Sequence, residues 1–292
     1  MRFPKCMVEP DTRSFTRFEL DVTSSLSLRL GKEDLLWFPG LTAELVADFI
    51  SRNQVEPSLV EQYGTSRWLA GNARPPAPDG GDIRVGPHIA KIEYLSSETA
   101  AGFEGLHFAV SRDPHIRELI QAAADLLTQV PNMAESIGSV VKVIHPIQSL
   151  RDYDVSHSTP ELPFSIFVSI PEKDERDALL RVAESLIHES MHLQLTLVDS
   201  IEPLAVDDRA SGYSPWKDEV RPITGLLHGL YVFAVIHQAL DILTGVQGEW
   251  RQYCRKRNSA IEREITSLPE APEGLSKMGT DLWRRCLESI AV

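Results

Sequence analysis

The chain has 292 residues, of which 42% are hydrophobic and 24% charged, a composition typical of a globular protein with ample material for a core. Its net charge of −13 argues against nucleic acid as the main partner, and no run of about twenty apolar residues predicts a membrane span. Three cysteines without a CxxC pair argue against a disulfide framework or a cysteine–zinc site. Together with an N-terminus that lacks a long apolar run, they predict a reducing, cytoplasmic location.

Short elements are predicted for the first 130 residues. Proline and glycine residues in 71–87 indicate a surface connector. Asp113-Pro114 is a typical helix start, because aspartate caps the first turn and proline fits its first position. The other expected elements are a strand at 26–30, an aromatic turn at 37–40, a helix at 42–52 capped by Thr42, a strand at 89–95, and the helix 113–129 with Ala122 and Ala123 in its buried stripe.

The second half is predicted to be mostly helical. Two β-branched runs, 140–147 and 164–170, predict strands. The polar loop 152–158 between them should lie near a metal site on the following helix if the strands pair as neighbours. Helices are expected at about 174–199, 223–243, 249–267 and 277–290, with a polar stretch at 199–220 and a solvated basic face at 255–257.

We therefore expect one α+β domain, predominantly α-helical, over residues 1–292. A small antiparallel sheet should pack beside the helix 174–199. Residues 1–130 would form an accessory portion that contacts the substrate, and residues 131–292 would form the core around a metal site.

The helix 174–199 carries the sequence His188-Glu189-Ser190-Met191-His192. Residues four apart project from one face of a helix, so His188 and His192 can bind one divalent metal ion. Glu189 could then act on a metal-bound water or orient a ligand. The alternative is an amphipathic core helix whose two histidines are bonded to neighbours, since HExxH also occurs by chance.

A catalytic metal usually has three protein ligands, so a third must be sought. Metzincin-type proteases have a histidine six residues beyond the second one, where this chain has Val198. Among the glutamates, Glu202 at the end of the first helix lies too near, and Glu219 is possible but lies just before the second helix. His228, early in the second helix, is the better candidate; its alternative role is a histidine bonded to a carbonyl in tight helix packing.

The surroundings of His228 suggest a binding site. Gly225 and Gly229 leave one flank without side chains, so another helix or a ligand can approach closely. Arg221 precedes His228 by seven residues, two helical turns, so both should point the same way, with Thr224 between them on that face. The guanidinium could then bind the far carboxylate of a five-carbon dicarboxylate on the metal. The alternative for Arg221 is a salt bridge with a nearby acid.

Lys217 would supply a second cation beside this face, and Trp216 could form a wall of the pocket.

Several blocks together resemble the HExxH-type peptide-modification family, whose members occur in pathways for ribosomally made, post-translationally modified peptides. The resemblance covers roughly residues 140–245, and together the blocks are far more specific than HExxH alone. They are residues 182–195 around the motif, Tyr213-Ser214-Pro215-Trp216-Lys217, Arg221-Pro222 and Gly225-Leu226-Leu227-His228-Gly229.

The characterised members of that family look like non-haem Fe(II) enzymes that use α-ketoglutarate and O2 to hydroxylate the β-carbon of residues in a precursor peptide. The resemblance implies that His188 and His192 hold iron. It also places Lys217 where the family commonly has arginine, so either Arg221 or Lys217 could meet the far carboxylate of α-ketoglutarate.

Three functions remain open from the sequence. In a peptide hydroxylase of this kind, Glu189 would orient a ligand. In a zinc-dependent peptidase or amide hydrolase, Glu189 would polarise a zinc-bound water. In a non-enzymatic module, the protein would bind a peptide and keep only a relic of a metal site. The ligand types do not separate iron from zinc, because imidazole suits both metals.

Overall fold

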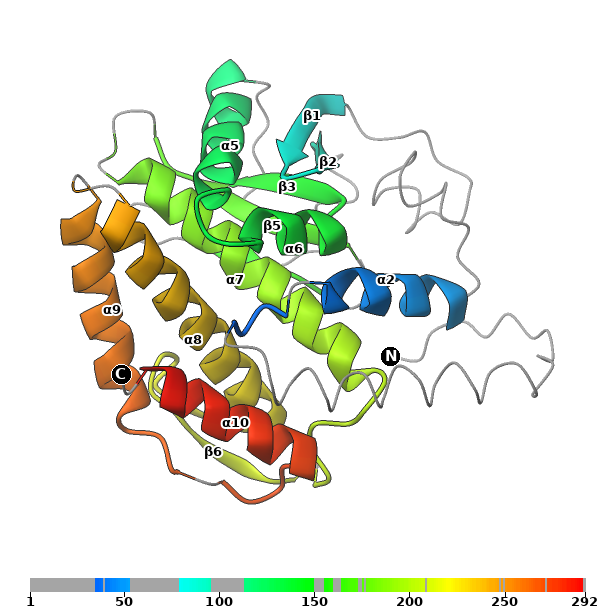
Figure 1. The fold of residues 1–292 in the computed structure, drawn as a ribbon, viewed down its shortest axis with the longest axis vertical. Coiled ribbons are helices and arrows are strands. Elements are labelled where there is room, and N and C mark those ends of the chain that lie inside the picture. Colours follow the sequence, from blue (N-terminus) through cyan, green and yellow to red (C-terminus); the bar gives the residue numbers. More distant parts are fainter. Residues whose placement is uncertain are drawn as a thin grey trace.

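The computed structural model describes residues 35–52 except 39, residues 79–95, 113–149, 155–159 and 164–172, and residues 175–290 with single gaps at 176, 208, 247, 249 and 271. The expected strand at 26–30 and the first parts of the expected loops at 71–87 and 152–158 lie outside these ranges. Within them, the predicted α+β, predominantly helical class is confirmed (Figure 1).

A five-stranded sheet has the order β1-β2-β3-β5-β4. Its strands are β1 (Asp79–Val85), β2 (His88–Glu93), β3 (Val143–Gln148), β4 (Ser156–His157) and β5 (Ser165–Ile170). The sheet is mixed rather than antiparallel, because β3 pairs in parallel with both β2 and β5. Parallel neighbours need a crossover of a dozen or more residues, and the segments 94–142 and 149–164 are long enough to supply it.

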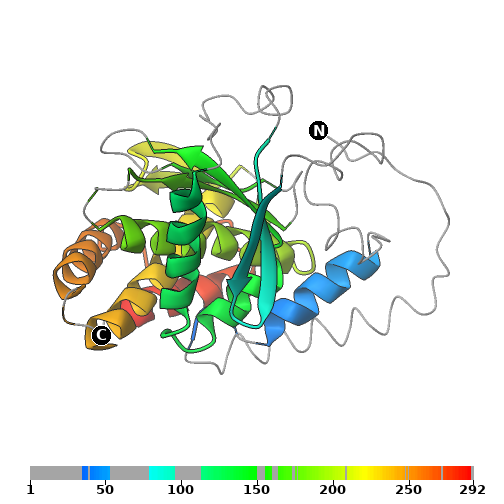
Figure 2. The same ribbon diagram turned by 90° about the horizontal axis from the view of Figure 1, so that it is seen from above.

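Helices cover one face of this sheet. In Figure 2 the green strands lie above α7, and the cyan hairpin of β1 and β2 runs down beside α5. The central helix is α7 (Ala178–Asp199), which packs against β5, α5 and α8. Ile144, Ile166 and Val168 of the sheet are fully buried in the main core with the inner face of α7. The other helices of this layer are α2 (Leu41–Arg52), α5 (Pro114–Leu127) and α6 (Met133–Val140).

The second half of the helical layer is built on α8 (Ile223–Val246), which lies between α7, α9 (Arg251–Ile265) and α10 (Lys277–Ile290) (Figure 1). Among the described residues, α8 is the one helix long and apolar enough to cross a membrane, but 72% of its most apolar stretch is buried in the fold. A helix that is apolar all round and covered on its sides is a core helix. The cytoplasmic location stays a prediction.

A short hairpin precedes α8, where the sequence predicted only a polar stretch. It consists of β6 (Ser211–Ser214) and β7 (Glu219–Pro222), which pair antiparallel. Its turn, residues 215–218, brings Trp216 and Lys217 to the wall of a cavity beside α7. The hairpin therefore positions two of the predicted site residues.

The predicted connector at 71–87 is wrong for its second half, because β1 begins at Asp79. The pairing of β1 with β2 shifts register between Asp79 and Asp82, which marks a β-bulge. Gly81 has a φ of +95°, and a Cβ on Gly80 would lie 2.5 Å from the Cγ2 of Ile92. The Gly-Gly pair thus serves a bulge and a close strand contact rather than a loop.

Other local predictions differ in detail. Thr42 does not cap α2, because the helix begins at Leu41 and the Thr42 hydroxyl instead donates to Gln194. Ala122 is exposed, and the buried stripe of α5 runs through Ala123 and Ala124. Residues 133–140 form α6, so β3 starts only at Val143. The Asp113 cap, β2, β5, α8, α9 and α10 are confirmed.

Candidate metal and cofactor site

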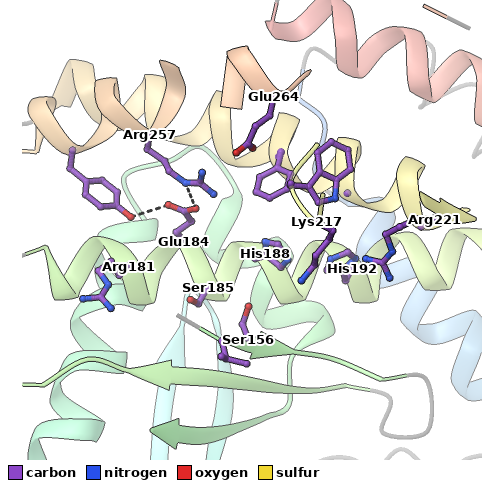
Figure 3. Close-up of a pocket in the computed structure, with 16 residues that line it drawn as sticks. Ser156, Arg181, Glu184, Ser185, His188, His192, Lys217, Arg221, Arg257 and Glu264 are labelled. Carbon is purple, nitrogen blue, oxygen red and sulfur yellow. Dashed lines mark hydrogen bonds and ion pairs between the residues drawn. The ribbon is translucent and has the colours of Figure 1, made fainter. Parts of the chain in front are cut away.

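His188 and His192 lie one helical turn apart on α7 and face the same cavity (Figure 3). Their ring centroids are 4.9 Å apart. The cavity has a volume of about 560 Å³ and runs along α7, bounded by β4, the β6–β7 turn, α8 and α9. The i, i+4 spacing therefore produces two imidazoles that open into one space.

His228 comes from α8 and meets His192. Their Nδ1 atoms are 3.4 Å apart, and their rings stack with centroids 5.6 Å apart and an interplanar angle of 16°. His228 does not itself line the cavity, which places it on the α8 side of the His192 ring. The structure thus brings all three predicted ligands into one chain of ring contacts, His188–His192–His228.

These three side chains suit a metal ion in type, and one pair of them also suits it in spacing. Two imidazole nitrogens bound to one ion at about 2.1 Å lie about 3.0–3.4 Å apart, which the His192–His228 pair matches at 3.4 Å. His188 approaches His192 edge against ring, with an interplanar angle of 64°, and does not complete a three-ligand group. Accordingly, no three His, Cys, Asp or Glu side chains in the described ranges form a complete metal-binding group as placed.

The three histidines are neutral near pH 7. Burial lowers the pKa of His188 to about 4, with Arg257 and Lys217 adding to the effect. Burial likewise lowers the pKa of His228 to about 4, and that of His192 falls well below its usual value because of burial and then the neighbouring histidines. Neutral imidazole is the form with a lone pair for a metal.

Glu189 is not among the residues that line the cavity, and its carboxyl group meets β4. Its carboxyl group is 2% exposed and accepts hydrogen bonds from the hydroxyls of Ser156 and Ser158. Burial raises its pKa to about 7, while these hydrogen bonds and Lys217 oppose the rise. Its Oε1 lies 3.8 Å from the Nε2 of His188. This arrangement holds Glu189 beside a metal-ligand candidate rather than in the open part of the cavity.

The loop between β3 and β5 lies beside the histidines, as expected if these two strands are neighbours in the sheet. β3 and β5 pair directly, and β4 in the loop between them forms the sheet edge beside α7. Val155 and Ser156 line the cavity. The prediction that this loop lies near the histidines is therefore confirmed for its described part.

Two positively charged side chains lie close to the histidines. Lys217 is directed toward His188 and His192, and within the described part of the chain its ammonium forms no ion pair (Figure 3). Arg221 also lines the cavity, and its Nε lies 3.6 Å from the Oε1 of the exposed Glu219. Arg221 thus lines the cavity and also forms the salt bridge that was its alternative role, while carboxylate binding stays a prediction.

Arg221 reaches the cavity by a different route from the one expected. It belongs to β7, and α8 starts only at Ile223, so the two-turn helical relation between Arg221 and His228 does not apply. Pro222 separates the strand from the helix. Thr224, which was placed on the same face, is half-buried on α8 and does not line the cavity.

The two glycines of α8 accommodate side chains from the hairpin. A Cβ on Gly229 would lie 2.3 Å from the Cζ2 of Trp216, so the indole packs directly on the helix backbone. A Cβ on Gly225 would be in ordinary contact with Arg221, 3.7 Å from its Nε. The predicted close approach is real at Gly229, and the approaching group is the indole of Trp216 rather than a helix.

Gly229→Ala is expected to displace Trp216 and to destabilise the protein by about 1–3 kcal/mol, as overpacking does in a filled site. Gly245→Ala is the matched control, because no atom lies within 4 Å of its Cβ position on the same helix. Alanine there should be neutral or stabilising by up to about 1 kcal/mol. Chemical unfolding and tryptophan fluorescence measure both effects; equal stabilities of the two variants would contradict this packing.

The far half of the cavity contains a polar network that sequence reasoning missed. Glu184, one turn before His188 on α7, accepts hydrogen bonds from the Tyr253 hydroxyl at 2.9 Å and from the Arg257 Nε at 2.6 Å. Arg257 also lies over the Phe233 ring, 5.4 Å from its centroid. The solvated face predicted for 255–257 is therefore wrong for Arg257. The i, i+4 relation of Glu184 to His188 was visible in the sequence, but the partners from α9 were not.

A second missed network lies behind the histidines and joins α7 to α8. The Thr42 hydroxyl donates to the Oε1 of Gln194 at 2.6 Å, and the Gln194 amide donates to the hydroxyl of Tyr231. The Tyr231 hydroxyl donates in turn to the Leu36 carbonyl at 2.7 Å. Because Gln194 and Tyr231 are close in sequence to His192 and His228, this buried network fixes the helices whose histidines must meet.

Comparison of the chain with models of protein families and with curated proteins finds no match.

Proposed function

We propose that this protein is an Fe(II)- and α-ketoglutarate-dependent oxygenase that hydroxylates the β-carbon of a residue in a ribosomally made precursor peptide. The observation that supports this best is a row of three neighbouring neutral imidazoles, two of which line a cavity that two cations also line. His188, His192 and His228 would hold the iron, since imidazole nitrogen is a suitable ligand for it. When bound, iron and α-ketoglutarate supply the oxidation of a C–H bond by O2.

The cations give the site its preference for an organic acid. Lys217 and Arg221 lie at one end of the cavity beside His192, where they attract an anion. A five-carbon keto acid has one carboxylate next to the keto group and a second at its other end. With the keto end at the histidines, the far carboxylate would meet Lys217 or Arg221 in a charge-assisted hydrogen bond.

The remaining cavity leaves space for a larger substrate. From His192 to Arg181 the lining of α7 extends over twelve residues, about 16 Å of helix from first to last. The far half is polar, with the Glu184–Tyr253–Arg257 network and Glu264 around it (Figure 3). A cavity longer than the keto acid and lined with hydrogen-bonding groups suits a peptide segment whose reacting carbon lies beside the histidines.

The direct test uses protein reconstituted with Fe(II), α-ketoglutarate and a candidate precursor peptide in air. We expect succinate to form and the peptide to gain the mass of one oxygen atom, with tandem mass spectrometry placing the oxygen on a β-carbon. Absence of both products with a peptide that binds the protein would overturn the proposal. Peptide cleavage by zinc-loaded protein would identify a hydrolase instead.

Glu189→Gln separates the two chemistries. Glutamine keeps the shape and can still bond the serine hydroxyls, so an oxygenase should retain iron and keep succinate formation within about tenfold of the unchanged protein. A hydrolase that uses Glu189 as its general base should lose about 100-fold or more. Metal content and succinate formation are measured together; a loss above about 100-fold with iron retained would contradict the positioning role of Glu189.

A further inference from the structure

A second recess lies on the outer side of the β6–β7 hairpin, away from the histidines. It has a volume of about 380 Å³ and is bounded by β6, the start of α8 and the connection between α9 and α10. Figure 1 shows β6 beside this connection. The floor is apolar, with Ile223 and Leu226 from α8, and Pro269 and Pro272 stand on the opposite wall.

The backbone of β6 offers unused hydrogen-bonding groups to this recess. The Ile223 amide donates to the Ala210 carbonyl, which makes these two residues a hydrogen-bonded pair. Alternation along an antiparallel ladder makes Gly212 the next residue bonded to β7, so Ser211 and Tyr213 direct their N–H and C=O groups to the other edge. In the part of the chain that the structure describes, these edge groups have no backbone partner.

We propose that this recess binds an extended peptide segment that adds a third strand to β6. An open edge strand is a template for another strand, and its main-chain groups supply hydrogen bonds that do not depend on sequence. Alternate side chains of the added strand would contact Ile223, Leu226 and the prolines. Glu273 is the one charged side chain among the described residues of the wall, so a basic residue in the peptide is favoured.

The position of the recess connects it to the candidate active site. The same hairpin carries Trp216 and Lys217 into the large cavity, and Tyr213 precedes Trp216 by three residues, so their Cα atoms are at most about 11 Å apart. A chain held along β6 therefore ends close to that cavity. We expect the bound segment to be a remote part of the modified peptide, and this identification rests on the proposed function. The strand-addition site itself does not rest on it.

The test uses the full chain without metal, in a buffer with a chelator, and a phage-displayed library of random dodecapeptides. We expect enrichment of peptides with alternating β-branched residues and a basic residue. Their binding, measured by fluorescence anisotropy, should weaken at least about tenfold in Ser211→Pro, which removes an edge N–H without removing a bond to β7. Ser211→Ala keeps the N–H and is the matched control, with unchanged affinity.

A second measurement does not depend on the variant being folded. In the unchanged protein, the selected peptide should slow hydrogen exchange at the Ser211 and Tyr213 amides, and N-methylation of alternate peptide bonds should abolish binding. No enriched peptide, or equal affinity for Ser211→Pro and Ser211→Ala, would overturn the proposal. A dimer in light scattering that Ser211→Pro dissociates would assign the edge to a second copy and likewise overturn it. Because no metal is present, failure here is distinct from failure of the oxygenase reaction.

Discussion

His228→Ala is expected to lower iron binding and succinate formation by at least about 100-fold, because loss of a direct ligand should cost more than the 10–100-fold typical of residues behind a ligand. The 3.4 Å separation of the His192 and His228 Nδ1 atoms is the geometric reason. Metal analysis of the purified protein and a succinate assay measure the two effects. His188→Ala and His192→Ala should behave in the same way.

His237→Ala is the matched control for this substitution. His237 lies on the same helix, but its Nε2 pairs with the Oε1 of Glu262 at 3.0 Å, and it does not line the large cavity. We expect it to keep iron content and turnover unchanged. If His228→Ala matched His237→Ala in both measurements while remaining folded by circular dichroism, His228 would be a packing residue and the three-histidine site would be wrong.

Lys217→Met is expected to raise the KM for α-ketoglutarate by about 10–100-fold while kcat stays within a few fold. The reason is that a hydrogen bond between charged groups contributes about 1.5–3 kcal/mol, and Lys217 has no competing ion pair among the described residues. Arg221→Gln should have a smaller effect, because Arg221 is 37% exposed and already lies near Glu219. Initial rates of succinate formation across α-ketoglutarate concentrations provide the measurement.

Two further variants support the assignment of the cofactor carboxylate. Lys217→Arg keeps the positive charge and should restore most of the affinity that Lys217→Met loses. Lys256→Met removes a cation from the exposed surface of α9 and should leave KM unchanged. A larger rise of KM in Arg221→Gln than in Lys217→Met would assign the carboxylate to Arg221, and no change in either would remove the cations from the proposed site.

The sequence by itself determined most of the helices and the face on which two histidines lie. Periodicity located α7 and α8, and the spacing of His188 and His192 placed both rings in one cavity, because a single helix sets that relation. The Gly229 backbone was also foreseen as a surface for close approach. These features are local, so the order of residues is enough to predict them.

Only the tertiary structure decided which distant groups share the cavity. In the structure, Arg257 and Tyr253 donate hydrogen bonds to Glu184. Glu189 accepts hydrogen bonds from serines in and next to β4. A hairpin that the sequence did not reveal places Lys217 beside the histidines. Long-range contacts of this kind depend on how whole elements pack and on strand register, and no periodic pattern in the chain encodes them. The prediction that Arg221 and His228 share one helix face was wrong for the same reason, because the chain changes from strand to helix between them.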